Sequence, residues 1–424
     1  MKRRDFFTAV PLGALALAQV KNAAAQEAPL AEKTAVQQVP FLPFLQNPGT
    51  DSMTVAWAVG GRATGYVEYG ETAELGKQAF NTLAGLKPLD DTFLFARITG
   101  LKSGTTYYYR AVTIPYKDDN KPAGEPVCSP IHSFRTVDPR ASRMSFAMIN
   151  DTHENQAILK ELTAKLPALK PDYIIWNGDI LNDVHSAERT IASLALPAGV
   201  FSAESPLLYL PGNHDCVGPW VHNLSRLMVP WEQENPQERA LSYNFAFRQG
   251  PVALVGLDTG ASSADAAPAW GGLIAHEPYR AKQAEWLAKV LKRPDIASAP
   301  FLVAICHIPL FEPDQTLNGG DTTDDWARFS RQGLTLWGPL LHKAGAQIVL
   351  SAHRHALRRE AGTPQRCWDQ IIGGGRDLDK DAAIVFGEAT TDKLTLTMRQ
   401  LNGTEYGVFE YKPRNFKRNG IRRV

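Results

Sequence analysis

The chain has 424 residues, of which 44% are hydrophobic, and this is ordinary for a globular protein with room for about two or three domains. Its formal net charge is +1, which argues against a nucleic-acid-binding or membrane-binding surface. Four scattered cysteines (Cys128, Cys216, Cys306 and Cys367) exclude a disulfide framework; one or two bridges are compatible with them, in a pairing that the spacing does not define.

Residues 1–25 have the organisation of an export signal rather than of a folded segment. A basic start at Lys2–Arg4 precedes a short apolar run at Ala9–Val20, and Ala23–Ala25 supplies small residues for cleavage. The arginine pair followed by Phe6 resembles a twin-arginine signal, which carries folded proteins. We therefore expect the twin-arginine export machinery as a partner and a periplasmic or secreted location, in preference to an ordinary secretory signal or a retained anchor. No later stretch approaches the ~20 apolar residues of a membrane span, so none is predicted in the mature chain.

Residues 39–137 predict an all-β domain of short strands separated by turns. The expected strands are Met53–Val59, Gly65–Tyr69, Leu94–Ile98 and Tyr107–Thr113. The segment Leu101–Ala111 resembles the tyrosine corner of fibronectin type III domains, and it makes this region a fibronectin III-like β-sandwich. We expect Tyr107 to form a hydrogen bond back across the corner while Leu101 and Tyr109 face the core. These tyrosines are therefore assigned to packing and not to chemistry.

Residues 143–424 predict an α/β domain that follows a linker at Val137–Ala141. From Met144 onward, apolar strands alternate with helical segments. Two helical stripes stand out, Ile158, Leu159, Leu162 and Leu166 in the first and Trp286, Leu287, Val290 and Leu291 in the second. The tail returns to strands, at Ile384–Phe386, Leu394–Met398 and Tyr406–Tyr411. An αββα sandwich, with two mixed sheets face to face and helices outside, accommodates this pattern.

Five short polar clusters each follow an apolar, β-prone run in this region. They are Asp151-Thr152-His153, Gly178-Asp179, Gly212-Asn213-His214-Asp215, Cys306-His307 and Ala352-His353-Arg354-His355. An α/β sheet places its site at the carboxyl ends of buried strands, so these clusters are expected to meet at one edge. An Asp-x-His or Gly-Asp pair alone is common by chance. Five clusters in this order, each at a strand end, are not.

The residue types in these clusters are those of a dinuclear metal site. Asp179 has two carboxylate oxygens with which to bridge two ions, and Asn213 offers a neutral carbonyl oxygen. The histidines add imidazole nitrogens, and no thiolate is required. Cys306 precedes His307 and could be mistaken for a nucleophile, but its side chain should point to the opposite side of the strand, which favours a buried packing role. Two such metal centres could clamp a phosphate and activate a hydroxide.

The order of these motifs resembles that of the calcineurin-like metallophosphoesterase superfamily, over residues from about Met144 to the end. This resemblance implies that one metal is held by Asp151, His153, Asp179 and His355, and the other by Asp179, Asn213, His307 and His353. It further implies that His214 is the acid or the phosphate-contacting histidine, with Asp215 orienting its ring. The expected cofactors are two divalent ions of manganese, iron or zinc.

A fibronectin-like domain ahead of such a catalytic domain is similar to the layout of purple acid phosphatases. Three positions depart from the pattern. His153 stands where that subgroup has Gly, and Asn182 stands where it has the ligating Tyr. A coloured iron site is therefore not expected. Ala352 also replaces the Gly that usually begins the last motif. Asn182 and Asp183 are candidates to contact the ligands.

Three functions are compatible with these observations. The first is a phosphomonoesterase acting on small phosphate esters outside the cytoplasm, with no nucleic-acid partner. The second is a phosphodiesterase or nucleotidase of the same fold, distinguished only by the walls of the cleft. The third is a cell-envelope binding protein with a vestigial metal site. The complete ligand set, together with His214, argues against the third.

Overall fold

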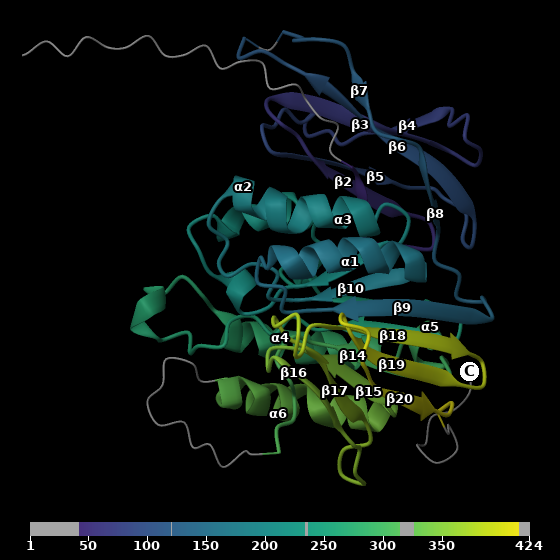
Figure 1. Ribbon diagram of the computed structural model, residues 1–424, viewed down its shortest axis with the longest axis vertical. Coiled ribbons are helices and arrows are strands. Elements are labelled where there is room, and N and C mark those ends of the chain that lie inside the picture. Colours follow the sequence, from purple (N-terminus) through teal and green to yellow (C-terminus); the bar gives the residue numbers. More distant parts are fainter. Residues whose placement is uncertain (1–41, 120, 234–235, 314–325, 415–424) are drawn as a thin grey trace, which may run out of the picture. The chain divides into compact units, whose positions relative to one another are not determined.

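The computed structural model describes residues 42–414 apart from 120, 234–235 and 314–325 (Figure 1). The predicted export signal of residues 1–25 lies outside the described residues. Within the described ranges no helix combines the length and apolarity needed to cross a membrane.

The largest sheet has nine strands in the order β20-β19-β18-β9-β10-β11-β1-β2-β5. Its strands are β1 (Phe44–Gln46), β2 (Met53–Ala58), β5 (Phe93–Ile98), β9 (Arg143–Ile149), β10 (Tyr173–Asn177), β11 (Leu207–Leu210), β18 (Ala383–Thr390), β19 (Leu394–Gln400) and β20 (Glu405–Tyr411). The central strands β9, β10 and β11 are parallel, and Ile175 lies opposite both Met148 and Leu208. Their carboxyl ends therefore share one edge of the sheet.

Two further sheets complete the strands. A six-stranded sheet has the order β12-β13-β14-β15-β17-β16. Its strands are β12 (Phe245–Gln249), β13 (Val252–Gly256), β14 (Phe301–Ile305), β15 (Ile348–Ser351), β16 (Ala356–Glu360) and β17 (Asp369–Gly374). The third sheet contains β3 (Ala63–Gly70), β4 (Lys77–Ala79), β6 (Thr106–Pro115), β7 (Val127–Cys128) and β8 (His132–Arg135). Strands β13, β14, β15 and β17 run parallel, so their carboxyl ends also lie together.

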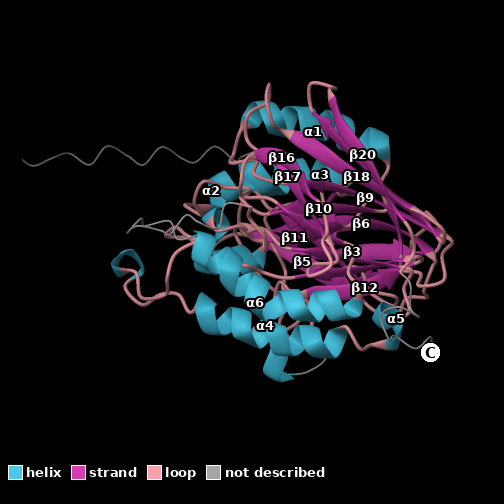
Figure 2. Cartoon of the chain, turned by 90° about the horizontal axis from the view of Figure 1, so that it is seen from below, coloured by secondary structure: helices cyan, strands magenta, loops and turns pink. Residues whose placement is uncertain are grey.

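The two large mixed sheets pack face to face between layers of helices (Figure 1). The helices are α1 (Gln156–Leu169), α2 (Ala187–Thr190), α3 (Leu196–Phe201), α4 (His276–Val290), α5 (Pro294–Ala297) and α6 (Trp326–Ala344). In Figure 2 the strands lie between α1 on one side and α4 and α6 on the other. Phe146, Ile175 and Val303 belong to the core between the sheets. The mixed sheets and outer helices agree with the predicted αββα arrangement.

Helix α1 illustrates how local sequence builds this layer. The Asn155 side chain accepts hydrogen bonds from the Ala157 and Ile158 amides and so caps the first turn. The predicted stripe, from Ile158 to Leu166, is the buried face of the helix. The helix ends at Lys170, whose backbone is left-handed. The Asn155 cap at the other end places the start of α1 immediately after the first predicted metal-binding cluster, Asp151-Thr152-His153.

The N-terminal strands are divided between two sheets. Strands β1, β2 and β5 continue the nine-stranded sheet, because β1 pairs in parallel with β11 through Gln46 and Leu207. Their other face packs against the five-stranded sheet in a core that contains Trp57 and Phe134. The Lys102 amide donates to the Tyr107 hydroxyl at 3.1 Å, which confirms the predicted hydrogen bond across the tyrosine corner.

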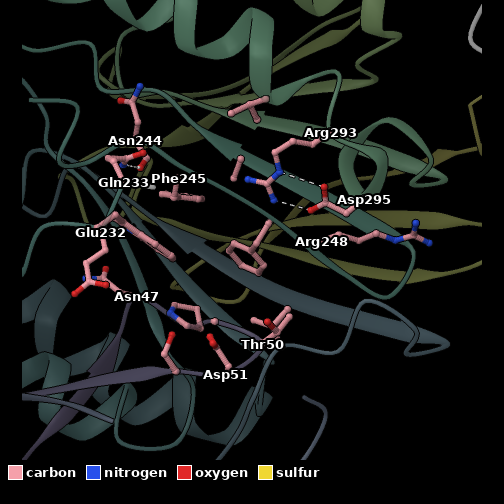
Figure 3. Close-up of a pocket in the computed structure, with 18 of the residues that line it drawn as sticks. Asn47, Thr50, Asp51, Glu232, Gln233, Asn244, Phe245, Arg248, Arg293 and Asp295 are labelled. Atoms are coloured by element: carbon pink, nitrogen blue, oxygen red, sulfur yellow. Dashed lines mark hydrogen bonds and ion pairs between the residues drawn. The ribbon is translucent and has the colours of Figure 1, made fainter. Parts of the chain in front are cut away.

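Side chains of β1 and its following turn also hold a segment of the second region. Gln46 donates through Nε2 to the Leu227 carbonyl at 2.8 Å and accepts the Val229 amide at 2.9 Å. Asn47 donates to the Val229 carbonyl at 2.7 Å. A cavity of about 510 Å³ lies beside this junction, with Asn47, Glu232 and Arg248 among its lining residues (Figure 3). None of the predicted metal ligands lines this cavity.

We expect removal of residues 28–138 to lower the thermal stability and solubility of the remaining chain. The sequence alone predicts a self-sufficient catalytic core, because every predicted ligand follows Met144. The pairing of β1 with β11 instead indicates a loss of stability, because the truncation would leave the edge of β11 unpaired. Differential scanning calorimetry of the two chains, with their metal contents, measures the effect. An unchanged midpoint would show that the N-terminal strands contribute nothing to the second region.

Candidate metal centre

The predicted site residues lie where the strands of the two large sheets end. Asp151 and Asp179 follow β9 and β10 in one sheet, and His307 and His353 follow β14 and β15 in the other. Backbone hydrogen bonds join the loops. The Asp151 amide donates to the Gly178 carbonyl at 3.0 Å, and the Ala352 amide donates to the His307 carbonyl at 2.9 Å. The His353 amide donates to Asp151 Oδ2 at 3.0 Å and so joins the loops of one sheet to those of the other.

The side chains form two groups that share Asp179. Ligand atoms of Asp151, His153, Asp179 and His355 lie within 4.8 Å of one another, and so do those of Asp179, His307 and His353. The Asn213 Oδ1 atom lies 2.8 Å from the His353 Nδ1 atom, beside the second group. The structure thus brings together all seven residues that the sequence assigned to two metals. Their role as ligands stays a prediction.

Several of these residues have a strained backbone. Five predicted ligands have φ angles between 45° and 68°, namely Asp151, His153, Asp179, His353 and His355. Such left-handed conformations cost non-glycine residues roughly 1–3 kcal/mol each and cluster at functional sites. Gly178 is also left-handed, and a Cβ atom there would collide with the His307 ring and the Gly212 backbone. The loops are therefore held in conformations that aim their side chains at a common centre.

Some of the donor atoms are buried without a hydrogen-bond partner. The Asp151 Oδ1 and His307 Nε2 atoms are both in this state. His307 donates through Nδ1 to the Asn177 carbonyl at 2.8 Å, which leaves Nε2 directed at the centre, 3.3 Å from Asp179 Oδ2. Buried polar atoms are nearly always satisfied, so orphaned oxygen and nitrogen atoms that converge are the arrangement a divalent cation requires. The donor set fits the two ions that the sequence predicted.

The electrostatics of the centre also favour cations. Burial lowers the pKa of His153 to about 4 and that of His353 to about 3, so both rings are neutral at pH 7 and can coordinate. Burial alone would lower the pKa of His307, but Asp179 outweighs it and raises the value to about 10. Burial alone would raise the pKa of Asp179, but the charge of His307 and its hydrogen bond outweigh burial, and the pKa is lowered. Asp179 is therefore ionised, and a bound cation would replace the proton on His307.

His214 lies beside this centre but is oriented by an unexpected group. Its ring is in edge contact with the His153 ring, with 4.9 Å between centroids. Its Nδ1 atom donates to the main-chain carbonyl of Asn182 at 2.8 Å. The expected contact from Asp215 is not formed. The Asp215 carboxylate is buried and accepts the amides of Ile180, Leu181 and Gly212 at 3.2, 3.2 and 3.0 Å.

This difference has a simple geometric cause. His214 and Asp215 are neighbours in a 3₁₀-helix that spans His214–Cys216, and adjacent side chains point about a third of a turn apart there. Asp215 consequently turns inward, where its carboxylate holds the two amides that follow Asp179 and the amide that precedes Asn213. Burial raises its pKa to about 7, with a further contribution from Asp179.

Cys306 is a buried strand-end residue, as predicted from its alternation with His307. Its thiol lies near the Ile308 carbonyl at 3.4 Å, and burial raises its pKa to about 12, so it is not a thiolate nucleophile. All four cysteines are free thiols.

Glu154 and Arg189 are two functional candidates that lie outside the five polar clusters. Glu154 accepts hydrogen bonds from Asn182, and Arg189 forms a two-point ion pair with Glu154. Only the position of Glu154 next to the first cluster could have drawn attention to it. The loop residues His185 and His222 are not in either group: His185 contacts Asp183 at 3.2 Å, and His222 lines a separate cavity of about 340 Å³.

Comparison with known families agrees with this geometry. Residues 144–357 match the family described as calcineurin-like phosphoesterase, and residues 40–136 match the N-terminal domain of purple acid phosphatases. The chain belongs to the calcineurin-like phosphoesterase family.

Two curated relatives come from Arabidopsis thaliana. Purple acid phosphatase 15 is 28% identical over 295 residues, which cover 62% of this chain and 48% of the relative. Probable purple acid phosphatase 20 is 23% identical over 294 residues, which cover 66% of this chain and 59% of the relative. The chain therefore spans about half of each relative that it matches.

Two solved structures share the fold. A purple acid phosphatase isolated from yellow lupin (Lupinus luteus) seeds has a TM-score of 0.66 at 15% identity, and the match covers 90% of this chain and 76% of that chain. PhoD has a TM-score of 0.56 at 13% identity, and the match covers 89% of this chain and 90% of that chain.

We expect Asp179→Asn to abolish the binding of both metals, because its carboxylate is common to the two groups and an amide has no charge to offer. Metal content, measured by mass spectrometry after loading with manganese or zinc, checks this. Asp392→Asn, in the exposed turn between β18 and β19, is the matched control and should load fully. Retention of one full equivalent by Asp179→Asn would show that the centre has no shared carboxylate.

Proposed function

We propose that this protein is a phosphoesterase that depends on two metal ions, and that it acts mainly as a phosphomonoesterase on small phosphate esters. The observation that carries the proposal is the buried carboxylate of Asp179, which belongs to both groups of metal-binding side chains. A pair of adjacent cation sites suits phosphoryl transfer, because charge gathers on several phosphoryl oxygens at once. A vestigial site in a binding protein would not require seven converging donors.

The chain's own residues define the other parts of the reaction. Asp151, His153, Asp179 and His355 would hold one ion, and Asp179, Asn213, His307 and His353 would hold the other. When bound, these ions supply positive charge to the phosphoryl oxygens. The Nδ1 proton of His214 is donated to the main-chain carbonyl of Asn182. The Nε2 atom is therefore the ring nitrogen that would face the ester. When the ring also carries a second proton, on Nε2, that proton can pass to the leaving oxygen, which is general-acid catalysis.

We further infer that the N-terminal strands form a fibronectin III-like sandwich and that the protein acts in the periplasm or outside the cell. The Tyr107 hydrogen bond and the core around Trp57 and Phe134 support the first inference. The twin arginines in residues 1–25 support the second. Export in the folded state suits an enzyme that must acquire its metals beforehand.

We expect the purified protein to hydrolyse a chromogenic phosphomonoester only after loading with manganese, iron or zinc. A parallel assay with a chromogenic diester separates the phosphomonoesterase from a phosphodiesterase or nucleotidase of the same fold. Preference for the monoester supports the proposal as stated, whereas preference for the diester moves it to the alternative. Full turnover in a chelator-treated sample shown to be free of metal would refute both.

We expect His214→Gln to retain its metals but to slow hydrolysis by roughly 10²–10⁴, the usual scale for a lost general acid. The defect should be largest for alkyl esters, whose leaving oxygen needs a proton, and smaller for nitrophenyl esters. Values of kcat for both ester types check this, with the exposed His222→Gln as the histidine control. Equal slowing of both esters would instead mark His214 as a phosphate contact.

A further inference from the structure

A polar network contacts His214 through the main-chain carbonyl of Asn182. Its centre is Glu154, which directly follows the predicted ligand His153. The Glu154 carboxylate accepts the Asn182 amide at 3.3 Å and the Asn182 side-chain Nδ2 at 2.8 Å. Arg189 donates to both Glu154 oxygens, through Nε at 2.9 Å and Nη2 at 2.5 Å. This two-point pairing fixes the carboxylate in direction as well as in place.

The network has further supports on each side. Arg189 Nη1 lies 3.0 Å from Asp183 Oδ1, and the other Asp183 oxygen lies 3.2 Å from His185 Nδ1. Asn182 also donates through Nδ2 to the His153 carbonyl at 3.2 Å. Asn182 is therefore held by Glu154 through its amide and by Glu154 and His153 through its side chain, and the next residue, Asp183, is held by Arg189. The Glu154 side chain is 13% exposed and the Arg189 side chain is 39% exposed, so water reaches the guanidinium more readily than the carboxylate.

Glu154 reaches this position because of its backbone. It has a φ of 59°, in the left-handed region, and its amide donates to the Ile180 carbonyl at 2.9 Å. The same hydrogen-bond ladder places His153 beside Asp179. The strained turn thus directs His153 into the metal centre and Glu154 towards Asn182.

These contacts fix the position of the main-chain carbonyl of Asn182. It accepts the Nδ1 proton of His214 at 2.8 Å, and among the residues that the structure describes no side-chain carboxylate forms a hydrogen bond to that ring. A neutral imidazole has one N–H group, so a fixed acceptor at Nδ1 selects one tautomer and one ring rotation. If the carbonyl moved, Nε2 would no longer be presented to the ester.

We propose that Glu154 and Arg189 are positioning residues for His214, acting through the main-chain carbonyl of Asn182. The kinetic consequence rests on the function proposed above, whereas the structural consequence does not. Loss of either partner releases Asn182, and His214 then loses its single tautomer. Neither residue touches the metals or the ester.

The experiment compares Arg189→Ala, Arg189→Lys and Glu154→Gln with the native full-length chain, all loaded with diamagnetic zinc. The control is Arg110→Ala, which removes a similar arginine–carboxylate pair, with Glu68 at 2.7 Å, from the N-terminal strands. Histidine labelled with nitrogen-15 reports the tautomer by NMR, and His214→Gln identifies the resonance. We expect the neutral His214 ring to carry its proton on Nδ1 alone in the native and control proteins, and to be a mixture of tautomers in Arg189→Ala and Glu154→Gln.

The kinetic arm measures kcat, KM and zinc content. We expect kcat for an alkyl phosphate to fall roughly 10–100-fold in Arg189→Ala, the usual scale for a lost partner of a site residue, with KM and zinc little changed. Arg189→Lys should lie between, because an ammonium group keeps the charge but not the two-point geometry.

The two arms fail in different ways. An unchanged His214 tautomer in Arg189→Ala and Glu154→Gln would overturn the proposal. Loss of zinc in parallel with activity would also overturn it, by assigning the network to the support of His153. If the native protein has no esterase activity, the proposed function fails while the NMR result still decides whether the network controls the ring. Should Arg189→Ala not fold, Arg189→Lys and Glu154→Gln carry the same decision.

Discussion

The buried carboxylate of Asp179 is the group on which the rest of this site depends. It follows Gly178, where any larger residue would collide with His307 and Gly212. One carboxylate oxygen accepts the His214 amide at 2.9 Å, and the other lies 3.3 Å from the His307 ring. A carboxylate removed from water is costly unless positive charge surrounds it. The loops of both large sheets converge on it, and the protonated ring of His307 supplies positive charge beside it. Bound cations are predicted to take over that role.

The N-terminal strands are part of the same construction. They extend the nine-stranded sheet through β1, and Gln46 holds the backbone of Leu227 and Val229, which follows the segment that carries Asn213 and His214. Trp220, on that segment, also packs edge-on against Phe93 of β5 at 5.8 Å. One wall of the predicted site therefore rests on strands that contribute no ligand. The two matched family regions are distinct in sequence but share a hydrogen-bonded sheet.

Asn182 is one of the expected departures from the purple acid phosphatase pattern. The order of the motifs predicts that it stands where that subgroup has a ligating tyrosine, and its side chain donates to Glu154 at 2.8 Å. With the side chain engaged in this way, the main-chain carbonyl is free to hold the ring of His214. The residue that is expected to leave this centre without a phenolate ligand is thus part of a hydrogen-bond network that reaches His214.

The sequence by itself predicted several strands, the buried face of α1 and the residues that meet at the strand ends. Strands β2 and β5 match the predicted Met53–Val59 and Leu94–Ile98 to within one residue, the buried face of α1 is the predicted stripe, and the seven predicted ligands converge. Side-chain periodicity is local, and polar residues at parallel strand ends must share an edge. Only the tertiary structure decided that β1 pairs with β11, that Asp215 turns inward, and that Arg189 reaches Glu154. Strand order and the direction of a side chain in an irregular loop depend on contacts between residues far apart in the chain, which no local pattern records.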